Sequence, residues 1–244
     1  MNNISQRLLE QQISQSRESA PRILDLQKQE DREDLSRLFD ERKIQHISDD
    51  YPEQQKEYFQ VMNPALVYAP DFEEKFQLYF KTLQEKAPLW QHGRWAYFPW
   101  ISTAVHILED EAFQLVRTAR NRNLITKEEH EKFYNATVGI AGLSVGNSVA
   151  LAIVLQGGAR HIRLADHDRL ALSNLNRIRS GVDSLGLPKG EVTARQIYML
   201  NPYATVEIFL EGLNKENIDR FFDGPPKLDI VIDEIDNLAV KYLI

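Results

Sequence analysis

The residues of this sequence best suited to chemistry lie between Asp166 and Lys189. Asp166 ends an apolar run, the cluster Ser173-Asn-Leu-Asn-Arg177 follows it, and Lys189 comes next. An arginine makes bidentate contacts to phosphate and a lysine supplies a compact positive charge, so the pair could neutralise a triphosphate as pyrophosphate leaves. The alternative interpretation is that Arg177 and Lys189 are solvated surface cations.

A glycine-rich turn precedes these residues. One apolar run ends at Gly142-Leu-Ser-Val-Gly146, a segment of helical character follows, and a second apolar run ends at Asp166. Backbone N–H groups of such a turn bind negative charge, so Gly142, Ser144 and Gly146 are candidates to contact phosphate. A carboxylate at the position of Asp166 can accept hydrogen bonds from ribose hydroxyls, although it could also be a strand-end acid that faces solvent. The order of these elements is typical of a nucleotide-binding βαβ unit.

Two further positions could bind a metal ion. Asp236 follows the apolar run 228–232 and would lie at the same sheet edge as the glycine turn, where its carboxylate could hold magnesium. A helix N-cap is the structural alternative for Asp236. His167 lies between two aspartates, but neighbouring residues of a strand point to opposite faces, so a solvated or packing role is favoured for it.

The elements that must position these residues predict an α/β fold. We expect a Rossmann-like, mostly parallel sheet with helices on both faces in residues 131–244, preceded by a mainly helical region in residues 1–130. The expected strands are 138–141, 162–165, 205–210 and 228–232, and the expected later helices are 192–200 and 218–222. The sequence stops at Ile244 inside a helical pattern, so we expect a longer native chain to complete the sheet.

The N-terminal region shows helical spacing with aromatic residues. A helix is expected after Asp71 and before Pro88, another over residues 103–121, and a third after the capping box formed by Thr126 and Glu129. The run from Trp90 to Trp100 contains all three tryptophans. It is interpreted as a packing cluster, with a peptide-docking groove as the alternative.

The composition restricts the class of protein. The net charge of -7 argues against a general nucleic-acid binder, which would present a basic face. The absence of cysteine excludes disulfides, thiolate metal ligands and a cysteine nucleophile within these residues. There is no secretion-signal pattern at the start and no apolar stretch long enough for a bilayer, so no membrane contact and a cytoplasmic location are expected.

A series of short motifs resembles the ThiF/MoeB family of adenylyltransferases, whose fold is shared with the enzymes that activate ubiquitin-like modifiers. In chain order the motifs are the glycine loop 142–146, Asp166-His-Asp168, Ser173-Asn-Leu-Asn-Arg177, Gly186-Leu-Pro-Lys189, Asn201-Pro202 and Asp233-Glu-Ile-Asp236-Asn237. The resemblance implies that the chain binds ATP and magnesium. It also implies that the C-terminal carboxylate of a ubiquitin-like protein, a sulfur-carrier protein or a peptide attacks the α-phosphate, giving an acyl-adenylate and pyrophosphate.

The resemblance also implies roles for individual residues. Magnesium would bind Asp236, and the catalytic group would comprise Arg177, Lys189, Asp236 and Arg120. The implied nucleotide-binding residues are Gly142, Ser144, Gly146, Asp166, Ser173, Asn174, Arg177, Lys189 and Asn237.

The segment Arg117-Thr-Ala-Arg120 is similar to an R-x-x-R element of the family, which places an arginine into the site of a partner subunit. The resemblance therefore implies a homodimer with Arg120 acting in trans. The alternative is that Arg117 and Arg120 complement the dipole at a helix C-terminus.

Three features depart from the family pattern. Ser144 and Val145 replace two glycines of the usual loop, the cysteines of many members are absent, and the family's later strands do not follow within the sequence. Two other functions therefore stay open: an NAD- or FAD-linked oxidoreductase that uses the same βαβ unit, and a non-catalytic scaffold. The Ser173 to Arg177 cluster argues against the oxidoreductase, because a dehydrogenase has no need for it.

Overall fold

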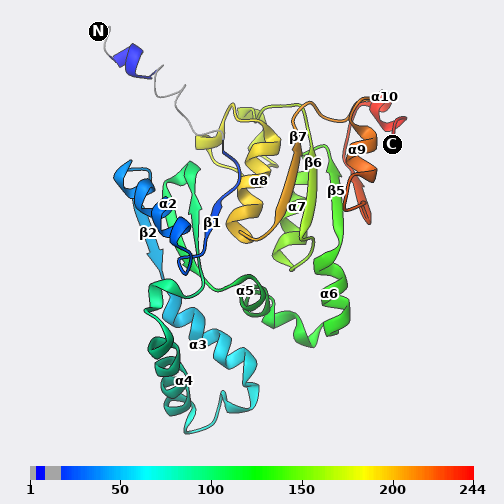
Figure 1. Ribbon diagram of the computed structural model, residues 1–244. Helices are drawn as coiled ribbons and strands as arrows, with labels where there is room; N and C mark the ends of the chain where they lie inside the picture. The colour runs from blue at the N-terminus through cyan, green and yellow to red at the C-terminus, as the bar shows by residue number, and fades with distance from the viewer. Residues whose placement is uncertain (1–3, 9–17) are drawn as a thin grey trace. The chain divides into compact units, whose positions relative to one another are not determined.

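The computed structural model describes residues 4–8 and 18–244 and separates the chain into two compact units (Figure 1). The first unit comprises Met1–Gln55 and Asp71–Leu108, and the second comprises Lys56–Pro70 and Glu109–Ile244. The division into regions 1–130 and 131–244 that the sequence suggests stays a prediction. Within the described ranges, no helix combines the length and the apolar character needed to cross a bilayer.

The first unit is built on a four-stranded sheet with strand order β1-β3-β4-β2. Strands β1 and β3 and strands β3 and β4 are antiparallel, whereas β2 is parallel to β4. Its elements are β1 (Arg22–Leu24), α2 (Gln29–Asp40), β2 (His46–Asp49), the start of α3 (Tyr51–Met62), α4 (Phe72–Lys86), β3 (Arg94–Phe98) and β4 (Thr103–Ile107). Its core comprises Leu24, Leu26, Leu38, Ile44, Trp95, Tyr97 and Ala104.

The prediction of a helix over residues 103–121 is wrong for residues 103–107. Thr103–Ile107 forms strand β4, and the helix α5 begins only at Asp110 and ends at Arg117. The β-branched residues Thr103, Val105 and Ile107 favour a strand, and the sheet of the first unit buries this segment. Helices still outweigh strands in the N-terminal region, as expected, but the sequence analysis did not foresee this sheet.

The second unit contains a four-stranded sheet with strand order β7-β6-β5-β8, in which every neighbouring pair is parallel. The mostly parallel sheet predicted for this part of the chain is therefore confirmed. Its helices and strands are the rest of α3, α5, α6 (Lys127–Asn135), β5 (Thr137–Ala141), α7 (Gly146–Leu155), β6 (His161–Ala165), α8 (Lys189–Leu200), β7 (Thr205–Phe209), α9 (Ile218–Asp223), β8 (Ile230–Asp233) and α10 (Leu238–Lys241). Short 3-10 turns also occur, including η4 (Ala119–Asn123).

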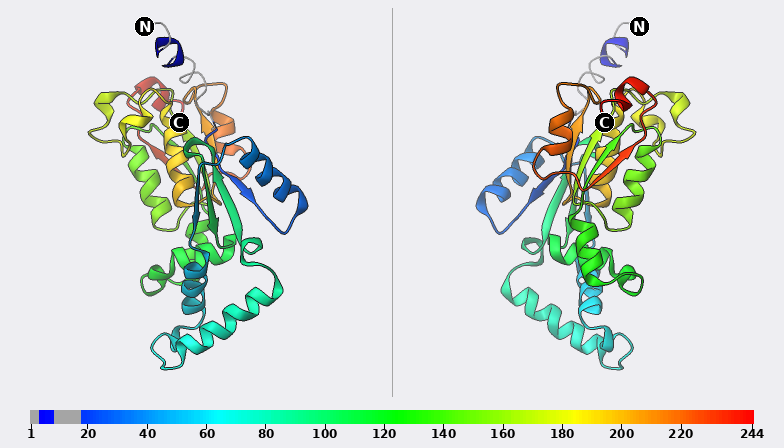
Figure 2. Two further views of the ribbon diagram at one scale, coloured as in Figure 1. Left: turned by 90° about the vertical axis from the view of Figure 1, so that its left-hand side faces the viewer. Right: turned by 90° about the vertical axis from the view of Figure 1, so that its right-hand side faces the viewer.

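Helices cover both faces of this parallel sheet. Ile140 of β5 lies in register with Leu164 and Ile208 on the neighbouring strands, so the three side chains share one face. A side chain at the first residue of α7 would collide with Ile140, which places α7 on that face. Gly139 points the other way and lies against Phe221 of α9. Figure 2 shows α7, in light green, and α9, in orange, on opposite sides of the strands.

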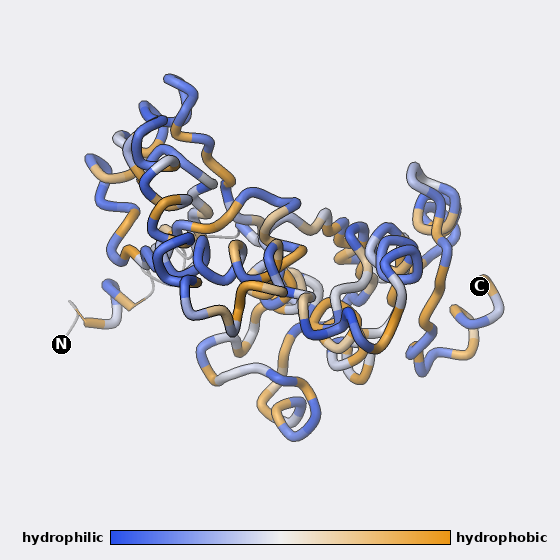
Figure 3. The backbone as a smooth tube through the Cα atoms, turned by 90° about the horizontal axis from the view of Figure 1, so that it is seen from below, coloured by the Kyte–Doolittle hydropathy of each residue, from blue (hydrophilic) through white to orange (hydrophobic). Residues whose placement is uncertain are grey.

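Local signals explain where several elements begin and end. Thr126 accepts a hydrogen bond from the Glu129 amide and Glu129 returns one to the Thr126 amide, which confirms the predicted capping box at the start of α6. Helix α4 ends at Lys86, two residues before Pro88. The helical segments contain both hydrophilic and hydrophobic residues along their length, as Figure 3 shows, which is expected of helices with one buried face.

The half-buried imidazole of His130 on α6, whose Nε2 atom is inaccessible to solvent, makes the stability of the second unit depend on pH. Its Nε2 atom has no hydrogen-bond partner among the described residues, and burial, followed by the positive charge of Arg117, lowers the pKa of His130 below its usual value of 6.5. The unfolded chain therefore binds more protons at mildly acidic pH, and stability should rise as pH increases from the lowered pKa to about 6.5. Burial also lowers the pKa of His161 in the same unit, so we expect His130→Gln to reduce this rise, but not to abolish it, in urea unfolding curves measured between pH 5 and 7. A slope unchanged by the substitution would contradict this explanation.

Candidate functional site

The segments with the predicted site residues lie at one edge of the parallel sheet. The glycine loop follows β5, Asp166 follows β6, and residues 234–237 follow β8. Strand β5 lies between β6, which is the next strand in sequence, and β8, which reaches the opposite side of β5 only after β7, so the strand order reverses at β5. In sheets of this kind ligands bind beyond the carboxyl ends of the strands where the order reverses. The topology therefore places the candidate site beside the end of β5.

The glycine loop lies close against the backbone that follows β8. Gly142 has a φ of +88°, and a Cβ atom at this position would lie 2.4 Å from the carbonyl oxygen of Glu234. Its amide donates to the Ala165 carbonyl at 2.8 Å. Only glycine fits here, because a side chain would be both strained and in collision. The loop leads directly into α7, whose N-terminal amides face the same sheet edge.

Substitution of Gly142 by alanine should destabilise the protein and the site together. The left-handed φ and the contact with Glu234 each oppose a Cβ atom, so we expect a loss of about 1–3 kcal/mol in unfolding free energy. Guanidinium unfolding of Gly142→Ala and of Gly186→Ala measures this. Gly186 also has a positive φ but open space around it, so the collision at Gly142 should make the loss there larger. Equal losses would show that the contact with Glu234 has no effect.

Asp166 fixes the glycine loop to the second strand. One of its carboxylate oxygens accepts a hydrogen bond from the Leu143 amide at 2.7 Å, and the other accepts one from the Asp168 amide at 2.8 Å. The side chain is buried. An ionised carboxylate offers about four acceptor positions, so Asp166 retains capacity to accept from ribose hydroxyls while it holds the loop.

Lys189 reaches the glycine loop from the first residue of α8. Its Nζ atom donates to Asp168 at 2.7 Å and to the Ser144 hydroxyl at 3.3 Å, and it lies 3.8 Å from Asp166. The lysine is only 5% exposed, so its charge is shielded from bulk water. The hydrogen bond from Lys189 is the main cause that lowers the pKa of Asp168. The structure thus brings together Ser144, Asp166 and Lys189, three of the residues predicted from sequence.

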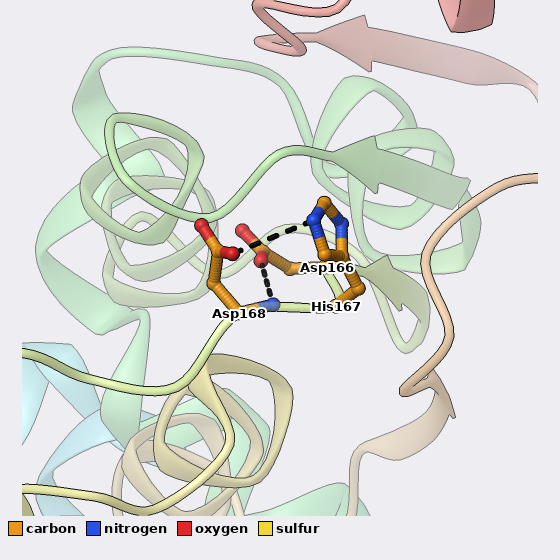
Figure 4. A group of neighbouring side chains, drawn as sticks. All are labelled: Asp166, His167 and Asp168. Atoms are coloured by element: carbon orange, nitrogen blue, oxygen red, sulfur yellow. Dashed lines mark hydrogen bonds and ion pairs between the residues drawn. The ribbon is translucent and has the colours of Figure 1, made fainter.

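The group Asp166, His167 and Asp168 has potential metal ligands within 4.8 Å of one another (Figure 4). Both oxygens of Asp166 already accept backbone amides, and Asp168 is paired with Lys189. His167 is exposed and lies 3.5 Å from Asp168. A buried ammonium group beside these carboxylates opposes a second cation. This geometry favours the solvated role expected for His167 over a metal site.

The Ser173 to Arg177 cluster lies on a surface loop. Asn174 is buried, and its side-chain oxygen accepts a hydrogen bond from the Ala171 amide at 2.9 Å, so it shapes the loop. Ser173 and Arg177 are exposed. The Arg177 guanidinium contacts the Asn176 side chain at 3.0 Å and the Ser173 carbonyl at 3.4 Å. The loop follows β6 and presents Arg177 to solvent, and the hydrogen bonds of Arg177 with described residues stay within the loop.

The segment after β8 contains an exposed carboxylate. Asp236 is exposed and has no hydrogen bond or ion pair with the other described residues, whereas Asp233 is paired with Lys241 at 2.9 Å. The side chain of Asn237, and not that of Asp236, caps helix α10 by accepting from the Ala239 amide at 2.9 Å. Asp236 comes two residues after Glu234, whose carbonyl oxygen lies against Gly142, and a free carboxylate oxygen is a suitable ligand for Mg²⁺.

The R-x-x-R element lies at the far end of α7 from the glycine loop. Arg117 donates to the Val154 carbonyl at 2.6 Å, and Asn121 donates to the Gln156 carbonyl at 2.9 Å. Burial is the main cause that lowers the pKa of Arg117. We therefore interpret Arg117 as a residue that packs this segment against α7. Arg120 on the turn η4 is exposed and makes no hydrogen bond or ion pair within the described part of the chain.

A cavity of about 1090 Å³ lies beside η4, α5 and α6 in the second unit. Its walls include Asn121, Tyr134 and Arg160, and none of the predicted nucleotide-binding residues lines it. The hydrogen bonds of Lys189 and Asp166, rather than this cavity, therefore mark the candidate site.

Sequence reasoning missed one member of the site. Asp168 belongs to the D-x-D motif but received no role, although it is the strongest partner of Lys189 in the structure. The isolated bridge between Arg169 and Pro188 shows that the chain returns to this motif just before Lys189. The spacing of the two motifs contains no signal for that return.

Known proteins resemble this chain in the same region. A model of the ThiF family matches residues 118–244. The uncharacterized protein MT1398 of Mycobacterium tuberculosis is 39% identical over 184 residues, which are 75% of this chain and 25% of that protein. The tRNA threonylcarbamoyladenosine dehydratase of Bacillus subtilis is 31% identical over 124 residues, which are 50% of this chain and 48% of that protein. The ATP complex of the E. coli tRNA N6-threonylcarbamoyladenosine dehydratase TcdA is 27% identical, with a TM-score of 0.49 over 55% of this chain and 54% of that one.

The chain therefore spans between a quarter and a half of the length of these curated relatives. The family match begins at Thr118 and includes the glycine loop, the Asp166 strand end, Lys189 and Asp236. Because this match covers more than half of the 244 residues, the chain belongs to the ThiF family.

Proposed function

We propose that this chain contains the nucleotide site of an ATP-dependent adenylyltransferase. The observation that supports it most is the buried ammonium group of Lys189, which lies against Ser144 of the glycine loop and beside Asp166. A shielded cation at a loop rich in backbone amides suits the phosphates of a nucleotide. The ribose would lie over Asp166 at the end of β6.

The proposed reaction is nucleotidyl transfer. An oxygen of a substrate carboxylate forms a bond to the α-phosphorus of ATP, the bond from that phosphorus to the bridging oxygen breaks, and pyrophosphate leaves with the electron pair. Gly142, Ser144 and Gly146 would hold the phosphates, and Lys189 and Arg177 would stabilise the charge that develops on the leaving group. No side chain of the protein acts as nucleophile, so positioning and electrostatics supply the catalysis.

Magnesium is the proposed metal ion. The exposed, unpaired carboxylate of Asp236, two residues after Glu234, fits a hard cation that prefers oxygen ligands and is shared with phosphate. When bound, the ion would neutralise phosphate charge. The proposed roles of Ser173, Asn174 and Asn237 are to shape the loops around the nucleotide, since Asn174 and Asn237 hold backbone amides of those loops.

A homodimer would explain the position of Arg120. The turn η4 is attached to the C-terminal end of α7, whereas the glycine loop precedes the N-terminal end. The 10 residues of α7 separate these ends by about 15 Å, so Arg120 is poorly placed for the site of its own chain. An arginine that is exposed, unpaired and remote from its own site suits the site of a second copy.

The proposed acyl substrate is the C-terminal carboxylate of a ubiquitin-like protein, a sulfur-carrier protein or a peptide. Membership in the ThiF family supports this class. The relatives from Bacillus subtilis and E. coli reported above are both named tRNA dehydratases, but the net charge of -7 here argues against an extended nucleic-acid surface.

ATP–pyrophosphate exchange tests the proposal. Labelled pyrophosphate should enter ATP only when a carrier protein or peptide with a free C-terminal carboxylate is present, and the same acceptor with an amidated C-terminus should be inert. Bulk tRNA serves as a third arm. Exchange with tRNA alone would refute the proposed substrate class, and the absence of exchange with every acceptor would refute adenylation.

A further inference from the structure

The loop that contains Arg177 is closed at its neck by backbone hydrogen bonds. The Leu170 amide donates to the Leu187 carbonyl at 2.8 Å, and the Gly186 amide donates to the Leu170 carbonyl at 2.9 Å. Residues 171–185 therefore form a closed surface loop between β6 and α8. Arg177 lies near the middle of this loop, so the neck alone does not fix its position.

The side chain of Arg177 depends on the loop backbone for its direction. Among the residues that the structure describes, its guanidinium donates hydrogen bonds only to the Asn176 side chain and the carbonyl of Ser173, both of which belong to the same loop. If the backbone around Arg177 moved, the guanidinium would move with it. A second attachment near residue 177 is therefore needed for a defined position.

Gln196 on α8 supplies that attachment. Its Nε2 atom donates a hydrogen bond to the carbonyl of Arg179, two residues after Arg177. Between them, Ile178 is 4% exposed and anchors the same stretch by its side chain. The other end of the Gln196 amide, Oε1, accepts a hydrogen bond from the Asn147 side chain at 2.8 Å.

Asn147 connects this attachment to the glycine loop. It follows Gly146 directly, it is fully buried, and its Nδ2 atom also donates to the Thr193 hydroxyl at 2.9 Å. Its side-chain oxygen has no partner among the described residues. A buried acceptor without a partner is destabilising, so packing alone does not account for an amide at this position.

We propose that Asn147 and Gln196 form an amide relay that holds the loop 171–185 in a fixed position relative to the glycine loop, and that the relay thereby positions Arg177 on the triphosphate. Both are positioning residues, and neither contacts the nucleotide. The effect on nucleotide binding rests on the proposed adenylyltransferase function, whereas the attachment of the loop is a property of the protein without ligand.

Two substitutions of Gln196 distinguish the two arms of the relay, which are its hydrogen bond to the Arg179 carbonyl and its hydrogen bond from Asn147. Gln196→Glu keeps an acceptor for Asn147 but turns a carboxylate oxygen toward the Arg179 carbonyl, so it breaks only the arm to the loop. Gln196→Met keeps the approximate size and breaks both arms. Met199→Ala is the matched control, because Met199 lies on the same helix with its side chain 56% exposed. Thermal unfolding of each variant establishes that the second unit is folded.

Amide hydrogen exchange of the ligand-free protein tests the attachment. Exchange in the peptide spanning 176–180 should become about twofold to fivefold faster in both Gln196 variants, since each loses the solvent-exposed hydrogen bond to the Arg179 carbonyl, and should be unchanged in Met199→Ala. Unchanged exchange in both Gln196 variants would overturn the relay.

Calorimetric titration with ATP tests the route through Arg177. Gln196→Met should raise the Kd for ATP about fivefold in the otherwise native chain and by less than about twofold when Arg177 is already alanine. An equal effect in both backgrounds would overturn the claim that the relay acts through Arg177. If the native chain binds no ATP, the proposed function fails, and the hydrogen-exchange result alone then decides whether the relay exists.

Discussion

Replacing Lys189 with methionine should reduce ATP–pyrophosphate exchange by about 10²–10³-fold. The methionine keeps the length of the side chain but removes the buried charge that lies 3.3 Å from the Ser144 hydroxyl. A preorganised cation in a shielded site is worth this much where charge develops on phosphate. The loss should appear both in the affinity for ATP and in kcat, because Lys189 would bind the phosphates in the ground state and the charge on the leaving group grows in the transition state.

A matched control distinguishes the loss of the Lys189 charge from the loss of any positive charge in the second unit. Lys215→Met removes an exposed lysine of the same unit that has no ion pair with the described residues, and it should leave exchange unchanged. Lys189→Met also leaves Asp168 without its partner, so the double variant with Asp168→Asn tests whether that carboxylate causes the loss. Recovery of activity in the double variant would show that Lys189 merely neutralises Asp168.

Variants of Arg120 and Arg177 should complement each other when mixed. In the proposed homodimer, Arg120→Ala and Arg177→Ala should each lose most exchange activity, because every site would lack one arginine. In a mixed dimer one site combines an intact Arg177 with the Arg120 of the other copy. A one-to-one mixture that re-equilibrates should therefore recover about a quarter of the native activity.

The complementation result depends on Arg120 acting across the dimer. If Arg120 served the site of its own chain, the mixed dimer would contain no complete site and mixing would recover nothing. Arg122→Ala is a suitable control, since Arg122 lies on the same turn but donates to the Val61 carbonyl at 2.9 Å. Activity lost equally in Arg122→Ala would indicate that the turn itself, and not Arg120, matters.

The parallel sheet was predictable because its strands are short apolar runs between turn residues. The strands expected at 138–141 and 162–165 differ by one residue from β5 and β6, since glycines or an aspartate follow each run. The secondary structure of the first unit was harder to predict from the sequence. Val105, Leu108 and Ala112 fit one helical stripe, but strand β4 and helix α5 divide them, because pairing with β2 and β3 decides the conformation of residues 103–107.

The same contrast holds at the candidate site. The position of Ser144 beside Asp166 follows from the order of a βαβ unit, whereas Lys189 lies on α8 beyond that unit and was suggested by its charge and by the family resemblance. The partner of Lys189 and the attachment of the Arg177 loop depend on how residues 171–185 return to the sheet edge. That path is set by contacts between residues far apart in sequence, such as Gln196 with Arg179, which no local pattern encodes.

The choice between nucleotides tests the central claim most directly. Calorimetric titration of the native chain with ATP and magnesium, and separately with NAD, compares the two ligands that a βαβ unit could hold. We predict saturable binding of ATP that is lost in Lys189→Met, and no saturable binding of NAD. Tighter binding of NAD than of ATP, or ATP affinity unchanged by the loss of Lys189, would contradict the account.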